Sequence, residues 1–164
     1  MFRLRIKPIT TIILATCIVL IGVVTTSAMG LWKTESSKIP VKFDQEEYSE
    51  QYNPADIRGS YTFAEISKLF NIPIEDLATA FLVEESVASE FKCKELELIF
   101  ADAPNEIGTG SVRMFVAFYL GLPYELTEDV YLLDVAEKLL NEKSSITEEQ
   151  ASYLNTHTFT FVQP

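Results

Sequence analysis

The sequence predicts an all-α fold, in which a single N-terminal transmembrane helix precedes a small bundle of about six short helices built from helix hairpins. Three observations predict it. Positions 8–32 form an uncharged, largely apolar run of 25 residues. Apolar residues beyond position 57 recur at helical spacing. Helix-capping residues, Gly and Pro interrupt this spacing often enough to end each helix after a few turns.

Charge is divided unevenly along the chain. Residues 1–33 carry four bases and no acid, whereas residues 34–164 carry nine bases and all 24 carboxylates. The two parts therefore have net charges of +4 and −15. Bases before the apolar run and mostly acids after it predict a single-pass protein of a bacterial-type cytoplasmic membrane, with its N-terminus inside and its C-terminal domain outside.

Four segments follow from this pattern. We expect a cytoplasmic basic segment at 1–7, a transmembrane anchor at 8–32, a flexible polar tether at 33–56 and an acidic helical domain at 57–164. As a helix, the anchor would be about 37 Å long, enough to cross roughly 30 Å of bilayer hydrocarbon and contact the lipid along its length. The alternative is a signal peptide cut after the small residues Thr26 and Ala28, which would leave a secreted domain.

The first helix hairpin is expected within 61–81, whose sequence is YTFAEISKLFNIPIEDLATAF. Thr62 and Glu65 are spaced as a capping box, Asn71 suits a left-handed helix end, and Pro73 suits the opening of a second helix. The residues expected to face the core are Phe63, Ile66, Leu69, Phe70, Leu77, Ala80 and Phe81.

Later helices are predicted at 93–101, at 111–121 as a buried central helix, at 130–143, and after a second capping box of Thr147 and Gln150. Their inward residues are expected to include Leu96, Ile99, Phe100, Val135, Leu139 and Leu140. The tail TFTFVQP alternates like a strand, although no partner strand is evident. LFNIPIE (69–75) also recurs as YLGLPYE (119–125), either because helix ends are chemically alike or because a hairpin unit is duplicated.

Nucleic-acid binding is excluded by charge, although the 61–81 hairpin has the outline of a helix-turn-helix. Its only base is Lys68, and its second helix carries the acids Glu75 and Asp76. Binding to DNA or RNA depends on Lys and Arg neutralising the phosphates. Residues 34–164, with their net charge of −15, would repel a nucleic acid.

Candidate ligand or partner contacts come from IGTGSVR (107–113), namely Gly108, Gly110, Ser111 and Arg113. A Gly-rich turn at a helix start can hold an anion, although this one lacks the ending of a P-loop. The simpler interpretation is a helix cap by Ser111 or Thr109, with Gly108 and Gly110 making the turn. Arg113 is then expected to pair inside the fold with Glu106 or Asp102.

No catalytic residue, cofactor site or metal site is predicted. The chain has a single histidine, His157, and no G-x-S-x-G turn. One cysteine, Cys17, falls in the predicted membrane segment, so Cys93 has no partner for a disulfide and is expected to be a small residue of a helix. An exported enzyme that uses His157 is the remaining catalytic alternative.

Several segments of the sequence resemble a known protein family. NPADIRGSYTFAEISKLFNIPIEDLATAF, FKCKELELIF, EIGTGSVRMFVAFYLGLPYEL and EKLLNEKSSITEEQASYLNTHT, spread over roughly 53–158, resemble a small helical extracytoplasmic domain of membrane-bound 4Fe-4S-binding proteins of the NapH-like, polyferredoxin type. The chain lacks that family's C-x-x-C-x-x-C-x-x-x-C-P runs, so no cluster ligand carries over.

This resemblance implies which kind of protein assembly the domain associates with. The expected function is a non-catalytic, membrane-anchored extracytoplasmic binding or assembly module, accessory to a membrane iron–sulfur or flavin electron-transfer complex. Its expected partner is a membrane protein, such as a 4Fe-4S or FMN-containing redox protein. The alternative is an extracytoplasmic sensor domain that binds a small ligand near the 107–113 turn.

Overall fold

The computed structural model describes residues 15–18, Thr25 and 38–161. The chain divides into two compact units, Met1–Lys38 and Ile39–Pro164. Most of the predicted anchor over 8–32, together with residues 1–7, lies outside the described residues; those that are described, 15–18 and Thr25, are helical. Among all described residues, no helix has both the length and the apolar character needed to cross a bilayer.

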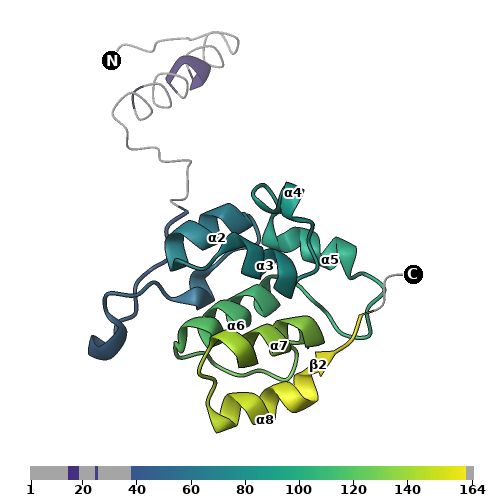
Figure 1. The fold of residues 1–164 in the computed structure, drawn as a ribbon. Helices are drawn as coiled ribbons and strands as arrows, with labels where there is room; N and C mark the ends of the chain where they lie inside the picture. The colour runs from purple at the N-terminus through teal and green to yellow at the C-terminus, as the bar shows by residue number, and fades with distance from the viewer. Residues whose placement is uncertain (1–14, 19–24, 26–37, 162–164) are drawn as a thin grey trace, which may run out of the picture. The chain divides into compact units, whose positions relative to one another are not determined.

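The second unit is mostly helical, which confirms the all-α class (Figure 1). Between residues 39 and 161 the α-helices are α2 (Phe63–Phe70), α3 (Ile74–Ala80), α4 (Glu85–Ala88), α5 (Leu96–Ile99), α6 (Thr109–Leu120), α7 (Asp134–Lys143) and α8 (Glu148–His157). Three short 3-10 helices, η1 (Glu46–Tyr48), η2 (Pro54–Asp56) and η3 (Cys93–Glu95), and two short strands, β1 (Leu132–Leu133) and β2 (Thr158–Phe159), complete it.

Helix α6 forms the centre of the core, as its apolar sequence predicts. Its residues 114–118 are all fully buried, and η2, η3 and α7 pack against it. A row of aromatic rings links it to the first hairpin. The ring centroid of Phe63 lies 5.9 Å from that of Phe81, and the ring centroid of Phe81 lies 5.7 Å from that of Phe115. Burying each ring contributes about 2–3 kcal/mol, so this row is a major part of the stability of the unit.

The first hairpin forms as expected. The N–H of Glu65 donates to Oγ1 of Thr62 at 3.2 Å, and the N–H of Thr62 donates to Oε2 of Glu65 at 2.8 Å, so the capping box is confirmed. Asn71 ends α2 with φ of 52°, and Pro73 stands directly before α3. The predicted inward residues are buried apart from Leu69, which is half-buried against the core.

Three helices end in the same way. Asn71, Leu82 and Gly121 follow α2, α3 and α6 with φ of 52°, 52° and 65°. The next residue in each case is apolar and buried, and its N–H donates to the carbonyl five residues earlier, as in a Schellman motif. No helix lies between Gly121 and Asp134, so the 50-residue repeat reflects similar helix ends, and no second copy of the α2–α3 hairpin exists there.

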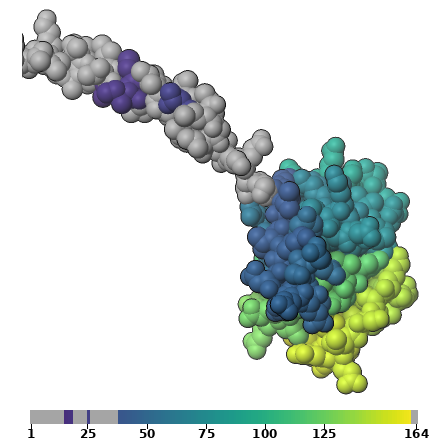
Figure 2. Space-filling model, turned by 90° about the vertical axis from the view of Figure 1, so that its left-hand side faces the viewer, coloured from purple at the N-terminus to yellow at the C-terminus, as the bar shows by residue number. Residues whose placement is uncertain are grey.

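Residues 41–53 form a short arm, within the range expected to be a flexible tether. The N–H of Phe43 donates to the carbonyl of Gln51 at 3.1 Å, and the N–H of Asn53 donates to that of Val41 at 2.8 Å. The arm lies on the face of the unit shown in Figure 2, in dark blue, and the Tyr52 ring packs 6.3 Å from that of Phe70. The ordered domain thus begins near Ile39, because contacts with distant residues fix a segment that has no apolar period of its own.

The C-terminal segments differ from expectation in two respects. The helix expected from 130 begins only at Asp134, because Leu132 and Leu133 form β1 and pair in parallel with Thr158 and Phe159. The strand predicted in the tail therefore has a partner.

The inward residues predicted around α5 are buried in part. Leu96 and Phe100, the residue after the helix, are buried as predicted, but Ile99 is 37% exposed because this four-residue helix presents a single narrow face to the core.

Candidate functional site

The turn before α6 places Gly108 and Ser111 in structural roles. Gly108 is the N-cap of α6, and its N–H donates to Oγ of Ser111 at 3.2 Å. Ser111 is buried, so its hydroxyl is used inside the fold. A Cβ on Gly108 would lie 3.1 Å from Cγ of Glu97, which is a reason for glycine at this position. Both residues therefore serve the start of α6, with Gly108 as the N-cap in place of the expected Ser111 or Thr109.

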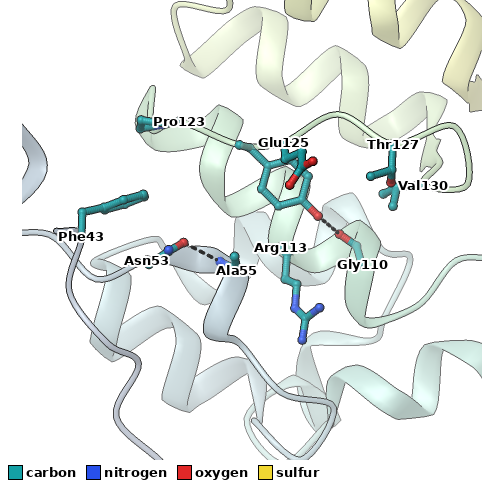
Figure 3. A pocket seen from close by; sticks show the side chains of 10 residues that line it. Phe43, Asn53, Ala55, Gly110, Arg113, Pro123, Glu125, Thr127 and Val130 are labelled. Atoms are coloured by element: carbon teal, nitrogen blue, oxygen red, sulfur yellow. Dashed lines mark hydrogen bonds between the residues drawn. The ribbon is translucent and has the colours of Figure 1, made fainter. Parts of the chain in front are cut away.

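Arg113 makes a different contact from the one expected. Its Nε donates to the carbonyl of Ile57 at 2.7 Å, which ties the end of η2 to α6. The ion pairs of the described residues do not include Arg113, so the expected Glu106 or Asp102 partner is replaced by a backbone carbonyl. In Figure 3 the guanidinium extends away from Glu125.

Arg113 and Gly110 nevertheless line an open pocket of about 530 Å³. In Figure 3, Phe43 from the arm and Pro123 from the loop after α6 lie at the left of the view, and Thr127 and Val130 lie at the right. The Tyr124 hydroxyl donates to the carbonyl of Gly110 at 3.4 Å, and burial raises the pKa of this phenol above its ordinary value. The lining residues are Phe43, Asn53, Ala55, Gly110, Arg113, Pro123, Tyr124, Glu125, Thr127 and Val130.

A second open pocket, of about 480 Å³, shares Pro123 and Tyr124 with the first. Tyr48 from the arm and Leu126 from the loop also line it. The rings of Phe43 and Tyr48 pack 5.8 Å apart, so the arm sides of the two pockets adjoin as well. We name the combined surface the arm groove and define it by Phe43, Tyr48, Pro123, Tyr124 and Leu126.

Two exposed carboxylates, Glu125 and Glu149, line the arm groove, and others adjoin its residues in sequence. None of them takes part in an ion pair of the described residues: Asp44, Glu46, Glu47, Glu125, Glu128, Asp129, Glu148 and Glu149. Of the nearby bases, Lys42 is bound to Glu50 at 2.9 Å and Arg113 is half-buried. The groove is therefore apolar and aromatic inside and anionic at its edge.

The other residues considered for chemistry lie in packing positions. The His157 ring stacks on Tyr153 at 3.8 Å, and its Nδ1 lies 3.0 Å from the Tyr153 carbonyl. Cys93 is fully buried in η3, and burial raises its thiol pKa to about 12, so it is protonated and inaccessible at neutral pH. Among the described residues, no three His, Cys, Asp or Glu side chains gather as a metal site would require.

Comparisons with protein families, with curated proteins and with solved structures found no match. The resemblance to the extracytoplasmic domain of 4Fe-4S-binding membrane proteins therefore stays a prediction. Sequence reasoning found Gly110 and Arg113 but missed the aromatic side of the pocket. The signal for that side was present in Phe43 and Tyr48, two of the three aromatic residues in the largely polar stretch 41–53.

Proposed function

We propose that this chain is a non-catalytic, membrane-anchored binding or assembly module that docks, outside the membrane, on a 4Fe-4S or FMN-containing electron-transfer protein. The observation that carries the docking role is the arm groove, where half-buried aromatic and proline side chains line two open pockets with polar residues beside them. Protein interfaces have this composition, with aromatic residues at the centre and polar residues around them.

The openness of the groove favours a macromolecular partner. Small-molecule sites are usually concave and bury most of their ligand. Both pockets of the arm groove instead lie open along the surface between the arm and the loop after α6, so a ligand there would keep much of its own surface in water. A partner protein can use such a surface because its remaining contacts lie outside the groove.

The membrane and redox parts of the proposal rest on the sequence. The uncharged run over 8–32, the change in charge after it and the resemblance over roughly 53–158 support an outward-facing module beside a membrane redox complex. An anchor would hold the domain near such a partner and raise its effective concentration there.

Site-specific crosslinking in membranes tests the docking role. A benzophenone amino acid replaces Phe43 in the arm groove or, as a control, the exposed Val87 of α4, and the native-level protein is irradiated and purified in detergent. We expect a discrete crosslinked membrane protein from position 43 and none from position 87, with iron–sulfur or flavin absorbance in the adduct. Recovery of the chain alone from both positions would refute the proposal.

The second candidate is a sensor for a small anion. It is favoured by Arg113, whose Nη1 and Nη2 take part in no hydrogen bond of the described residues and which lines the first pocket. The test is a thermal shift with acetate, citrate and phosphate on the wild type and on Arg113→Gln. A rise in Tm for the wild type alone would support the sensor, and equal or absent shifts would refute it.

A further inference from the structure

We propose that the arm groove binds an extended, lysine- and arginine-rich segment of a partner protein, with apolar side chains of that segment between Phe43, Pro123 and Tyr124. This rests on the proposed docking function and gives the chemistry of what docks. Three properties of the groove carry it: its two adjoining pockets, its rings and its carboxylates.

The shape fits an extended chain. The two pockets share Pro123 and Tyr124; the first is also lined by Phe43 and Arg113, and the second by Tyr48 and Leu126. Extended peptides are commonly recognised in open grooves lined by aromatic residues, because the rings receive apolar and proline side chains without enclosing them. The arm, on the face shown in Figure 2, contributes Phe43 and Asn53 to the first pocket and Tyr48 to the second.

The charge selects a cation. The exposed carboxylates Glu125 and Glu149 line its pockets, and six others adjoin its residues in sequence. The half-buried Arg113 also lines it, and Lys42, next to Phe43 in sequence, is bound to Glu50. Carboxylates bind Arg and Lys through charge-assisted hydrogen bonds, and aromatic faces attract the same cations from within about 6 Å. Carboxylates and rings side by side therefore favour the same residues in the partner.

Other occupants are opposed by the same charge. An anionic lipid surface, a nucleic acid and a second copy of this acidic domain would each bring negative charge against the groove. A basic segment instead gains from long-range attraction, which speeds association and weakens as salt is added.

Fluorescence anisotropy on the full-length chain in detergent tests the proposal. The probe is a labelled twelve-residue peptide of Arg, Pro and Leu; the comparison peptides replace Arg with Glu, or Pro and Leu with Ser. The groove variant carries Asp44→Lys, Glu47→Lys and Glu125→Lys. The matched control carries Glu85→Lys, Glu90→Lys and Glu142→Lys, the same change of charge at exposed positions elsewhere.

Of the three peptides, we expect the Arg-Pro-Leu peptide to bind the wild-type chain most tightly. Its affinity for the groove variant should be at least tenfold lower than for the wild type, and its affinity for the control variant less than twofold lower. Its affinity should fall several-fold between 50 and 300 mM salt. Should the groove variant fail to melt cooperatively by circular dichroism, Glu125→Gln with Tyr48→Ala replaces it, with the same expectation.

Three results would overturn the proposal: no binding, equal loss in both triple variants, or equal binding of the Ser peptide. The first leaves a basic segment without support, the second reduces the effect to net charge, and the third removes the role of the rings. If the peptide fails while crosslinking from position 43 succeeds, docking stands and the basic segment is refuted. If both fail, the docking function falls as well.

Discussion

The Tyr119 hydroxyl donates a 2.6 Å hydrogen bond to Oδ2 of Asp76, while Nζ of Lys143 bonds to the other carboxylate oxygen. These three side chains come from α6, α3 and α7 and meet at one carboxylate that is only 5% exposed. A buried charge is tolerated in a core when both of its oxygens are bonded, as they are here. Asp76 thus joins three helices that otherwise pack through apolar contacts.

Replacing Asp76 by Asn should cost about 1–3 kcal/mol in the free energy of unfolding, because the ion pair is lost and the Tyr119 hydroxyl meets a weaker acceptor. Lys143 is 44% exposed and can turn to water, which keeps the loss below that of a fully buried pair. Urea unfolding at pH 7 measures it. Asp134→Asn is the matched control, since Asp134 pairs with the exposed Lys138 and should cost less than about 1 kcal/mol. Equal losses would contradict this assignment.

Stability should fall as the pH rises from about 10 to about 12. Burial and the bond to Asp76 raise the pKa of Tyr119 from 10.0 to about 12, and burial likewise raises that of Tyr153 to about 12. Between the unfolded and folded pKa values the folded chain holds more protons, so raising the pH favours unfolding. Chemical denaturation at pH 9, 10, 11 and 12 measures this. Tyr119→Phe should show a shallower fall, and an unchanged slope would exclude Tyr119 as a source.

Replacing Leu82 by glycine should stabilise the domain. It has φ of 52°, a conformation that costs an L-residue about 1–2 kcal/mol, and its side chain is 41% exposed. Leu82→Gly should raise the free energy of unfolding by about 0.5 kcal/mol after the added chain entropy of glycine. The reverse change at the equivalent helix end, Asn71→Leu, should lower it by about 1 kcal/mol. Thermal and urea unfolding measure both variants. A change of the same sign in the free energy of unfolding of the two variants would contradict this prediction.

Tyr61 should tolerate loss of its hydroxyl. The ring is fully buried, and its Oη has no hydrogen-bond partner among the residues that the structure describes. A buried hydroxyl without a partner costs about 1–3 kcal/mol, so Tyr61→Phe should leave stability unchanged or raise it by up to about 1 kcal/mol. Tyr119→Phe, which removes a bonded hydroxyl, gives the opposite sign in the same assay. A loss of more than 1 kcal/mol in Tyr61→Phe would show that Oη is bonded in solution.

Features set by local chemistry could be predicted from the sequence. The two capping boxes and the left-handed ends at Asn71 and Gly121 depend on residues within one helical turn, and they form as expected. The central helix could also be predicted, because its apolar residues point in all directions.

Features set by distant contacts could not be predicted. Leu132 and Leu133 look like the first turn of α7, and only their pairing with Thr158 and Phe159 makes them a strand. The arm has no apolar period, and Asp56 and Phe70 hold it by contacts that no local pattern shows. Two of the ten residues that line the first pocket, Gly110 and Arg113, were therefore predicted, while its aromatic residues were not.

The parallel pairing of β1 with β2 also has a consequence for local opening. α8 buries only Leu154. Besides this two-residue pairing, its contacts include the Tyr153 hydroxyl, which lies 2.6 and 2.7 Å from the carbonyls of Thr127 and Val130 and donates its one proton to either, and the His157 ring, whose centroid lies 5.1 Å from that of Tyr131. Amide hydrogens in α8 should therefore exchange with solvent through a subglobal opening of low free energy, while those of α6 should exchange only on global unfolding. The last helix is thus the part of the domain that can detach and re-form while the core stays folded.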